Sequence, residues 1–184
     1  MRQVTAALFI SLDGVVEAPD QWQFDLFDQD MASAMAEAIA QEDAVLMGRV
    51  TYQEWAGYWP TATDEPYASH INNVPKYVVS TTLNSVDWNN STLIKGSLAE
   101  AVDRLKRQPG KNIGVAGSPT LVRNMLREGL LDVLTLSVHP VIAARGRRLF
   151  EDWRDVQRLD LVGSQTTRSG IAILTYRPAG RSRA

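Results

Sequence analysis

The alternation of apolar and polar segments along the chain predicts strands separated by helices as far as Val138. Short, nearly continuous apolar runs are typical of strands that are buried on both faces of a sheet. Such runs predict strands over residues 4–10, 44–47, 76–80, 92–94, 112–116 and 133–138. Their alternation with helical segments favours an α/β domain with a mainly parallel sheet.

Helices are predicted between these strands from apolar spacing and from capping residues. Met31, Met35 and Ile39 recur at helical spacing. Asp30 is the expected N-cap of that helix, and Ser97 is the expected N-cap of a later one. The predicted helices span residues 31–40, 50–57, 98–107 and 119–127.

The end of the chain shows a different pattern, in which strand follows strand. The turn signal is Arg168-Ser169-Gly170, flanked by residues 159–167 and 171–177. We therefore expect an antiparallel C-terminal hairpin beside the parallel strands, with helices flanking the sheet. Residues 1–178 are expected to form a single domain, and residues 179–184 a basic C-terminal tail.

Composition narrows the classes of function. Of the 184 residues, 45% are hydrophobic and 22% charged, as in ordinary globular proteins. The net charge of -2 argues against a general nucleic-acid surface, and the lack of cysteine excludes disulfides, zinc thiolates and thiol nucleophiles. No apolar stretch reaches the roughly 20 residues of a membrane span, and no signal-peptide pattern is present. We expect a cytoplasmic location with no nucleic-acid or membrane partner.

Residues 58–74 are predicted to form a long loop, a feature that is uncommon unless it lines a site or a partner. The two histidines are isolated in the sequence. His70 falls in this loop and is expected to be solvated, whereas His139 ends a strand and is expected to be structural. No His, Asp and Glu residues have metal-ligand spacing, so no metal site is expected.

Polar turns follow three of the predicted strands, which is where open α/β sheets bind their ligands. These turns are Gly48-Arg49-Val50-Thr51, Ser80-Thr81-Thr82 and Ala116-Gly117-Ser118. A helix start offers free N–H groups and a positive dipole end to a phosphate, and the guanidinium of Arg49 suits a terminal phosphate. Together the turns predict a nucleotide site. The alternative is that their glycine and hydroxyl residues only cap helices.

The usual nucleotide fingerprints are absent, which argues against a standard Rossmann dehydrogenase or a P-loop NTPase. The chain also lacks an activated protein nucleophile, which fits a reaction carried by a bound cofactor. Aromatic residues crowd the regions after the first two strands and are candidates for a pocket that binds a flat heterocycle. The candidates are Trp22, Phe27, Trp55 and Tyr58, with core packing as the alternative for each.

The order of these motifs resembles the dihydrofolate reductase superfamily. The most similar branch contains the C-terminal reductase domain of the riboflavin-biosynthesis deaminase/reductase. The resemblance covers nearly the whole chain. It rests on Ser11-Leu12-Asp13-Gly14, residues 45–52, 76–83 and 115–121, Gly129-Leu130-Leu131-Asp132 and residues 139–150.

This resemblance implies an NADPH-binding fold with a central mixed sheet. The residues it implies for the cofactor are Gly48, Arg49 and Thr51 at the phosphates, Ser80 and Thr81 at the 2′-phosphate region, Ala116, Gly117, Ser118 and Thr120 at the pyrophosphate, and Ala7 and Ile10 near the nicotinamide. Asp13 is also expected near the nicotinamide. It is the leading candidate to orient the substrate or relay a proton, with a plain Asp-Gly turn as its alternative.

The chain departs from the family pattern at three places. Ala116-Gly117 replaces a paired glycine, and Ala144-Arg145-Gly146 replaces a Gly-x-Gly. Folate reductases hold the pterin with an acidic residue at a helix start. Asp25, Asp28 and Asp30 lie near that place, none of them in the folate-reductase context. We therefore do not expect folate reduction, and the substrate stays open.

Two hypotheses follow for the function. The first is an NADPH-dependent reductase of a small heterocyclic substrate, pterin- or pyrimidine-like, or of a carbonyl compound. The second is a non-enzymatic nucleotide- or ligand-binding module that kept the fold without the reaction. We also expect a symmetric homodimer through the late elements, because the C-terminal strands would otherwise leave an apolar edge. The alternative is a monomer in which residues 178–184 cover that edge.

Overall fold

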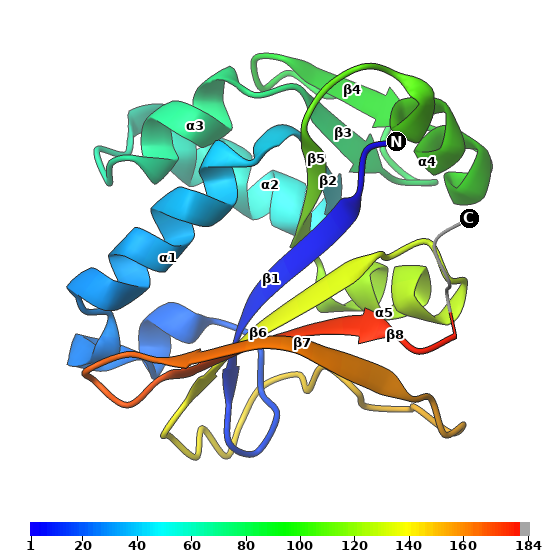
Figure 1. Cartoon of the computed structure of the whole chain (residues 1–184). Coiled ribbons are helices and arrows are strands. Elements are labelled where there is room, and N and C mark those ends of the chain that lie inside the picture. The colour runs from blue at the N-terminus through cyan, green and yellow to red at the C-terminus, as the bar shows by residue number, and fades with distance from the viewer. Residues whose placement is uncertain (181–184) are drawn as a thin grey trace.

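A single eight-stranded sheet organises the computed structural model, which describes residues 1–180 (Figure 1). The strands are β1 (Val4–Ser11), β2 (Glu42–Gly48), β3 (Lys76–Val79), β4 (Ser91–Ile94), β5 (Asn112–Gly117), β6 (Val133–His139), β7 (Leu159–Thr166) and β8 (Ala172–Pro178). They lie in the order β4-β3-β2-β5-β1-β6-β8-β7. The first six in this order are parallel, and β8 and β7 add an antiparallel end. The predicted fold class is confirmed.

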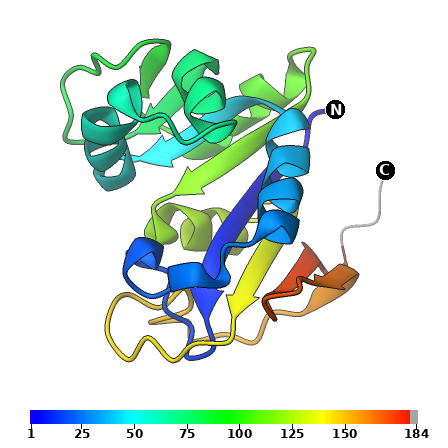
Figure 2. The same cartoon turned by 90° about the vertical axis from the view of Figure 1, so that its left-hand side faces the viewer.

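Helices cover both faces of the sheet. They are α1 (Gln29–Ala40), α2 (Arg49–Tyr58), α3 (Tyr67–Asn73), α4 (Leu98–Arg107) and α5 (Pro119–Arg127), with short 3-10 helices η1 (Pro19–Gln21), η2 (Phe24–Leu26) and η3 (Trp59–Thr61). The first three α-helices lie on one face, and α4 and α5 lie on the other (Figure 1). Figure 2 shows the parallel strands fanning out in a twisted sheet, as expected for L-amino acids.

Burial on both faces explains the continuous apolar runs in the sequence. In β2, Leu46 packs into the core under α4 and α5, together with Val102 and Met125. Its neighbours Val45 and Met47 pack into a second core under α2 and α3. A strand between two helical layers has no solvent face, so its sequence does not alternate.

The prediction of a long loop over residues 58–74 is wrong. Helix α3 lies there and buries Ala68 and Ile71. The ammonium group of the buried Lys76 donates to the carbonyl oxygens of Ile71 at 2.8 Å and Val74 at 3.0 Å, at the end of the helix. So short a helix depends on tertiary contacts rather than on its own propensity, and it therefore leaves little periodic signal.

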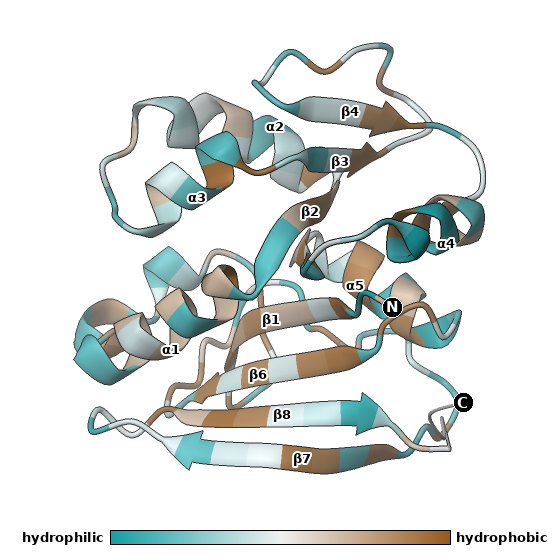
Figure 3. Ribbon diagram, turned by 45° about the horizontal axis from the view of Figure 1, so that its top comes forward, coloured by the Kyte–Doolittle hydropathy of each residue, from teal (hydrophilic) through white to brown (hydrophobic). Residues whose placement is uncertain are grey.

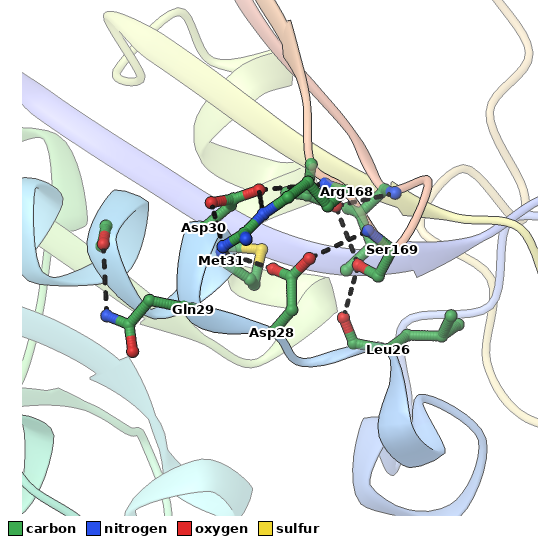
Figure 4. Close-up of polar contacts among 10 residues, drawn as sticks. Leu26, Asp28, Gln29, Asp30, Met31, Arg168 and Ser169 are labelled. Atoms are coloured by element: carbon green, nitrogen blue, oxygen red, sulfur yellow. Dashed lines mark hydrogen bonds and ion pairs between the residues drawn. The ribbon is translucent and has the colours of Figure 1, made fainter.

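Helix α1 begins earlier than predicted, and the assignment of Asp30 as its N-cap is wrong. Asp28 has the extended backbone of an N-cap, and its carboxylate accepts from the Met31 N–H at 2.9 Å. Asp30 lies in the first turn, where it instead accepts two bonds from the Arg168 guanidinium at 3.0 and 3.1 Å (Figure 4). Both carboxylates suit the positive end of the helix dipole, so composition alone does not distinguish them.

These bonds fasten α1 to the turn between β7 and β8. Besides the Arg168–Asp30 pair, the Ser169 N–H donates to Asp28 at 2.9 Å, and the Ser169 hydroxyl donates to the Leu26 carbonyl at 2.7 Å (Figure 4). We call this set of contacts the α1 clasp. It fixes the start of the helix relative to the antiparallel end of the sheet.

One part of the sheet is open on the side of α1. Ala7 is exposed although β1 has strands on both sides. Across β6 and β8 it lies in register with Thr135 and Thr175, whose hydroxyls are 3.2 Å apart. We call these three residues the open sheet face. Figure 3 shows that β8 and β7 have mixed hydropathy, whereas β1 is more hydrophobic.

Candidate nucleotide and substrate site

The three polar turns expected to form one site follow neighbouring strands. β3, β2 and β5 are adjacent and parallel, so the turns after Val79, Gly48 and Gly117 lie at the same edge of the sheet. The carboxyl edge of a parallel sheet is the usual place for a ligand. The structure thus brings together the turns that the sequence separates by about thirty residues each.

Helices α2 and α5 start at this edge, and neither has a side-chain cap among residues 1–180. Gly48 is the N-cap residue of α2, and Ser118 is that of α5. A helix start without a side-chain cap leaves its first N–H groups available to solvent or to an anion.

The two helix starts are in close contact. A Cβ added at Gly48 would lie 3.0 Å from the Ser118 hydroxyl and 3.2 Å from the Ser118 backbone nitrogen. A Cβ added at Gly117 would lie 3.1 Å from the Thr51 hydroxyl, and its φ of +127° is one that residues with side chains rarely adopt. Because both positions are glycine, the backbone N–H groups at the start of α2 can lie close to those at the start of α5.

Arg49 adds the positive charge at this edge. It is the first residue of α2, it is exposed, and its guanidinium donates to the Gln53 side chain at 3.0 Å. No carboxylate within residues 1–180 forms an ion pair with it. Thr120 lies in the first turn of α5 and Ala116 near the end of β5, both half-buried.

The turn after β3 has a more local role than expected. The buried Ser80 hydroxyl accepts from the N–H groups of Thr82 at 3.1 Å and Leu83 at 3.0 Å, so it shapes the turn. Thr81 is exposed beside it. Of this predicted pair, Thr81 is the side chain that solvent reaches.

Ala7 and Ile10, both expected near a nicotinamide, face opposite sides of β1. Ile10 is buried in the core under α4 and α5, whereas Ala7 belongs to the open sheet face. The pairing of Ala6 with Val115 places Ala7 level with Ala116, at the end of β5. The small side chain of Ala7 therefore lies beside the helix starts and leaves the sheet accessible there.

Asp13 is held by several hydrogen bonds. Its carboxylate accepts from the Ser11 hydroxyl at 2.7 Å and from the N–H groups of Ala143 and Ala144 at 2.9 and 3.0 Å, and it pairs with Arg148 at 3.3 Å. These bonds, that from Ser11 foremost, lower the pKa of Asp13 to about 2. An acid ionised at neutral pH is a poor proton donor, and these contacts fit the alternative of a turn residue, which holds the turn after β1 against residues 143–144.

The acids near the start of α1 are also engaged. The Met31 N–H lowers the pKa of Asp28, and the Arg168 side chain lowers the pKa of Asp30. Both carboxylates are therefore ionised and occupied in the α1 clasp (Figure 4).

The four aromatic candidates fall into two groups rather than one pocket. Trp22 packs against His139, and Phe27 packs edge-on against Phe9, near the carboxyl end of β1. Trp55 packs against Trp59 and Tyr67, and the exposed Tyr58 hydroxyl donates to Asp64 at 2.9 Å. Trp22 and Phe27 thus lie on the α1 side of β1, whereas Trp55 and Tyr58 belong to the α2–α3 region.

Of the two predictions for histidines, one is confirmed and one is wrong. His139 is fully buried, as expected of a structural residue, and burial lowers its pKa. His70 is not solvated: its side chain is 15% exposed, and its Nε2 lies 4.0 Å from the Glu42 carboxylate. Among residues 1–180 no three His, Cys, Asp or Glu side chains gather in a group suited to a metal.

Glu42 is a site candidate that sequence reasoning missed. Its side chain is 16% exposed, and the Thr5 hydroxyl donates to its carboxylate at 3.2 Å. A Cβ added at Gly114 would lie 2.3 Å from a carboxylate oxygen of Glu42, so that oxygen rests on the glycine backbone. Burial raises the pKa of Glu42 to about 7. The only sequence signal was a glycine inside a strand, which often marks a close approach.

In the described part of the chain, no helix is long and apolar enough to cross a bilayer.

Comparison with known proteins agrees with the fold. The family model of the RibD C-terminal domain matches residues 2–173. The uncharacterized protein YyaP of Bacillus subtilis (strain 168) is 31% identical over 180 residues, covering 95% of this chain and 94% of YyaP. The uncharacterized protein YwjB of the same organism is 26% identical over 167 residues, covering 89% and 91%.

Solved structures show the same fold at low identity. A candidate riboflavin biosynthesis protein from Shewanella sp. PV-4 has a TM-score of 0.77 at 20% identity, covering 96% of this chain and 98% of that one. A pyrimidine reductase-like protein from Corynebacterium diphtheriae has a TM-score of 0.69 at 16% identity, covering 100% and 93%. The deaminase/5-amino-6-(5-phosphoribosylamino)uracil reductase of Thermotoga maritima has a TM-score of 0.68 at 12% identity, covering 97% of this chain and 57% of that one. With the family model matching nearly its full length, the chain belongs to the RibD C-terminal domain family.

Proposed function

We propose that the protein is an NADPH-dependent reductase that transfers hydride to a small pyrimidine-like or related heterocyclic substrate. The observation that carries this proposal is the meeting of two helix starts without side-chain caps at Gly48 and Ser118, with Ala7 exposed on the neighbouring strand. The first feature suits a pyrophosphate and the second suits a flat ring.

The residues at the carboxyl edge fit NADPH in charge and in space. The N–H groups at the starts of α2 and α5 would bind the pyrophosphate, and any side chain at Gly48 or Gly117 would crowd the contact between them. Arg49 and Thr81, both exposed, would bind the 2′-phosphate. No acidic residue precedes or follows Arg49 or Thr81 directly, whereas recognition of a free ribose 2′-hydroxyl usually relies on one.

Bound NADPH would supply a hydride, and the protein has to place and shield the acceptor. The open sheet face offers a flat, small-residue surface for a ring beside Ala7. Asp13 would hold the turn after β1 in place through Ala143 and Ala144 and so shape one end of this surface. A site of this kind needs few reactive side chains.

The names of two structural neighbours support this class of substrate. Two of the structural neighbours carry reductase names, one of them pyrimidine reductase-like and the other a 5-amino-6-(5-phosphoribosylamino)uracil reductase. We extend to this chain only what the two names share, which is the reduction of a pyrimidine-type compound. Trp22 and Phe27 lie on the side of β1 where such a ring would bind.

The test is NADPH oxidation, followed at 340 nm, with a panel of aminopyrimidines, pterins and small carbonyl compounds. We expect oxidation that depends on both the substrate and the protein, and that is faster with NADPH than with NADH. Tight binding of NADPH with no turnover on any compound would instead favour the alternative, a ligand-binding module that kept the fold. The absence of both binding and turnover would contradict the proposal.

A further inference from the structure

We propose that Glu42 is the proton donor of this site, and that it acts as a neutral carboxylic acid on the α1 side of the sheet. The inference rests on the proposed function. Reduction of a C=N or C=O bond needs a hydride at carbon and a proton at the heteroatom. Asp13, the acid that sequence reasoning favoured for this task, is occupied elsewhere, and so are two acids near the start of α1.

Asp13, Asp28 and Asp30 are each bound to backbone N–H groups or to an arginine, and each has a lowered pKa. At neutral pH they are carboxylates with no proton to give. Glu42 differs, because no basic side chain within residues 1–180 forms a close ion pair with it apart from His70 at 4.0 Å.

The surroundings of Glu42 favour its neutral form. Thr5 donates to it from β1, and Tyr67 and His70 face it from α3. Burial lowers the pKa of His70, as do the charges of Lys76 and Lys111, so this neighbour is neutral near pH 7. Burial likewise raises the pKa of Glu42 to about 7 despite the Thr5 bond.

Two features of the fold place this acid near the open sheet face. The Glu42 carboxylate occupies space over Gly114 that a Cβ would fill, so it lies directly on the sheet. Its partner Thr5 lies two residues before Ala7 on the same face of β1, roughly 7 Å away at about 3.3 Å per residue. Glu42 begins β2 and so lies toward the amino-terminal ends of the strands, where a heterocycle that lies against Ala7 and extends toward Thr5 would reach it.

The step balances in protons and electrons. The hydride forms a C–H bond at the acceptor carbon, and the π-electron pair of the C=N or C=O bond moves to the heteroatom. That atom takes the Glu42 proton, leaving a carboxylate. The exposed edge of Glu42 allows it to regain a proton from water before the next cycle.

The first experiment needs no turnover. In protein labelled with ¹³C-glutamate, the side-chain carboxyl signal that disappears in Glu42→Gln belongs to Glu42. We expect this signal to titrate with a midpoint near pH 7. A midpoint below pH 5, in the ordinary range for glutamate, would overturn the proposal.

The second experiment uses single-turnover NADPH oxidation with the best substrate of the panel. We expect Glu42→Gln to slow oxidation about 100-fold or more, the usual contribution of a general acid, while NADPH affinity stays unchanged. Glu37→Gln, which alters an exposed acid of α1, is the control and should retain the wild-type rate. The wild-type rate should fall above about pH 7 as Glu42 ionises. Thr5→Val, which removes the bond that lowers the Glu42 pKa, should move this fall to higher pH.

The outcomes separate the two proposals. If the wild-type protein and Glu42→Gln oxidise NADPH at the same rate, Glu42 is not the proton donor. The proposed reductase function is then still supported. If the wild-type protein neither binds NADPH nor oxidises it with any substrate, the proposed function fails and the role of Glu42 fails with it.

Discussion

At the scale of single residues, Arg49 is an exposed cation at the edge where two helices begin. We predict that Arg49→Ala weakens NADPH binding by about 1.5–3 kcal/mol, the range for a hydrogen bond to a charged group. NADH, which lacks the 2′-phosphate, should lose much less. Calorimetric titration of both cofactors measures this difference, with Arg104→Ala on the opposite face as the control. Equal losses for NADPH and NADH would remove Arg49 from the 2′-phosphate.

Glu42 makes stability depend on pH. Its pKa is about 7 in the folded protein and 4.5 ordinarily, so folding favours the protonated acid. The protonated acid's contribution to the free energy of unfolding is complete below pH 4.5, declines as the pH rises, and is lost above pH 7. The difference between the two pKa values corresponds to about 3 kcal/mol of folding stability. Glu42→Gln should therefore unfold at higher urea concentration than the wild type at pH 8, with a much smaller difference at pH 4.5. The same difference at both values would contradict the assignment of this pKa.

The residue scale also shows where sequence reasoning stops. The sequence identified Gly48, Arg49 and Gly117 because a strand, a glycine and a helix start follow one another directly along the chain. It did not identify Glu42, because the residues that surround its carboxylate, Thr5 and Gly114, are distant from it in sequence. Burial and partners of this kind exist only after folding.

At the scale of elements, the contact between the starts of α2 and α5 depends on Gly117. We predict that Gly117→Val abolishes NADPH binding, because the added side chain would meet Thr51 and the residue has a φ of +127°. The circular dichroism spectrum should retain its α/β form. Gly57→Ala is the matched control, since nothing lies within 4 Å of a Cβ there, and it should bind NADPH normally. Normal binding by Gly117→Val would show that this junction is not the phosphate site.

The elements themselves were largely predictable. The strands and four of the five α-helices follow from apolar runs and helical spacing, and Ser97 caps α4 as expected, its hydroxyl accepting from Glu100 at 3.3 Å. Helix α3 was missed because it is seven residues long and its end is completed by the buried Lys76. The α1 clasp was missed because Asp30 and Arg168 are 138 positions apart.

At the scale of the whole molecule, β7 ends the sheet with an exposed edge. Leu161 and Val162 are 55% and 51% exposed in this strand. Part of the tail expected to cover the edge, residues 181–184, lies outside the described residues. Proteins seldom leave such an edge free, so we still predict a symmetric homodimer.

Light scattering at micromolar concentration tests this prediction. We expect a mass of two 20.4 kDa chains. Leu161→Lys, which places a charge on the edge strand, should shift the mass toward one chain. A mass near 20.4 kDa for the wild-type protein would rule the dimer out.

The central claim is that one NADPH molecule lies across the starts of α2 and α5. Hydrogen–deuterium exchange with and without saturating NADPH tests it most directly, because it reports on the backbone N–H groups that would bind the phosphates. We predict slower exchange in residues 48–53 and 117–122, at the starts of α2 and α5, and no change in helix α4. Unchanged exchange in both helix starts, with NADPH bound or not, would contradict the account.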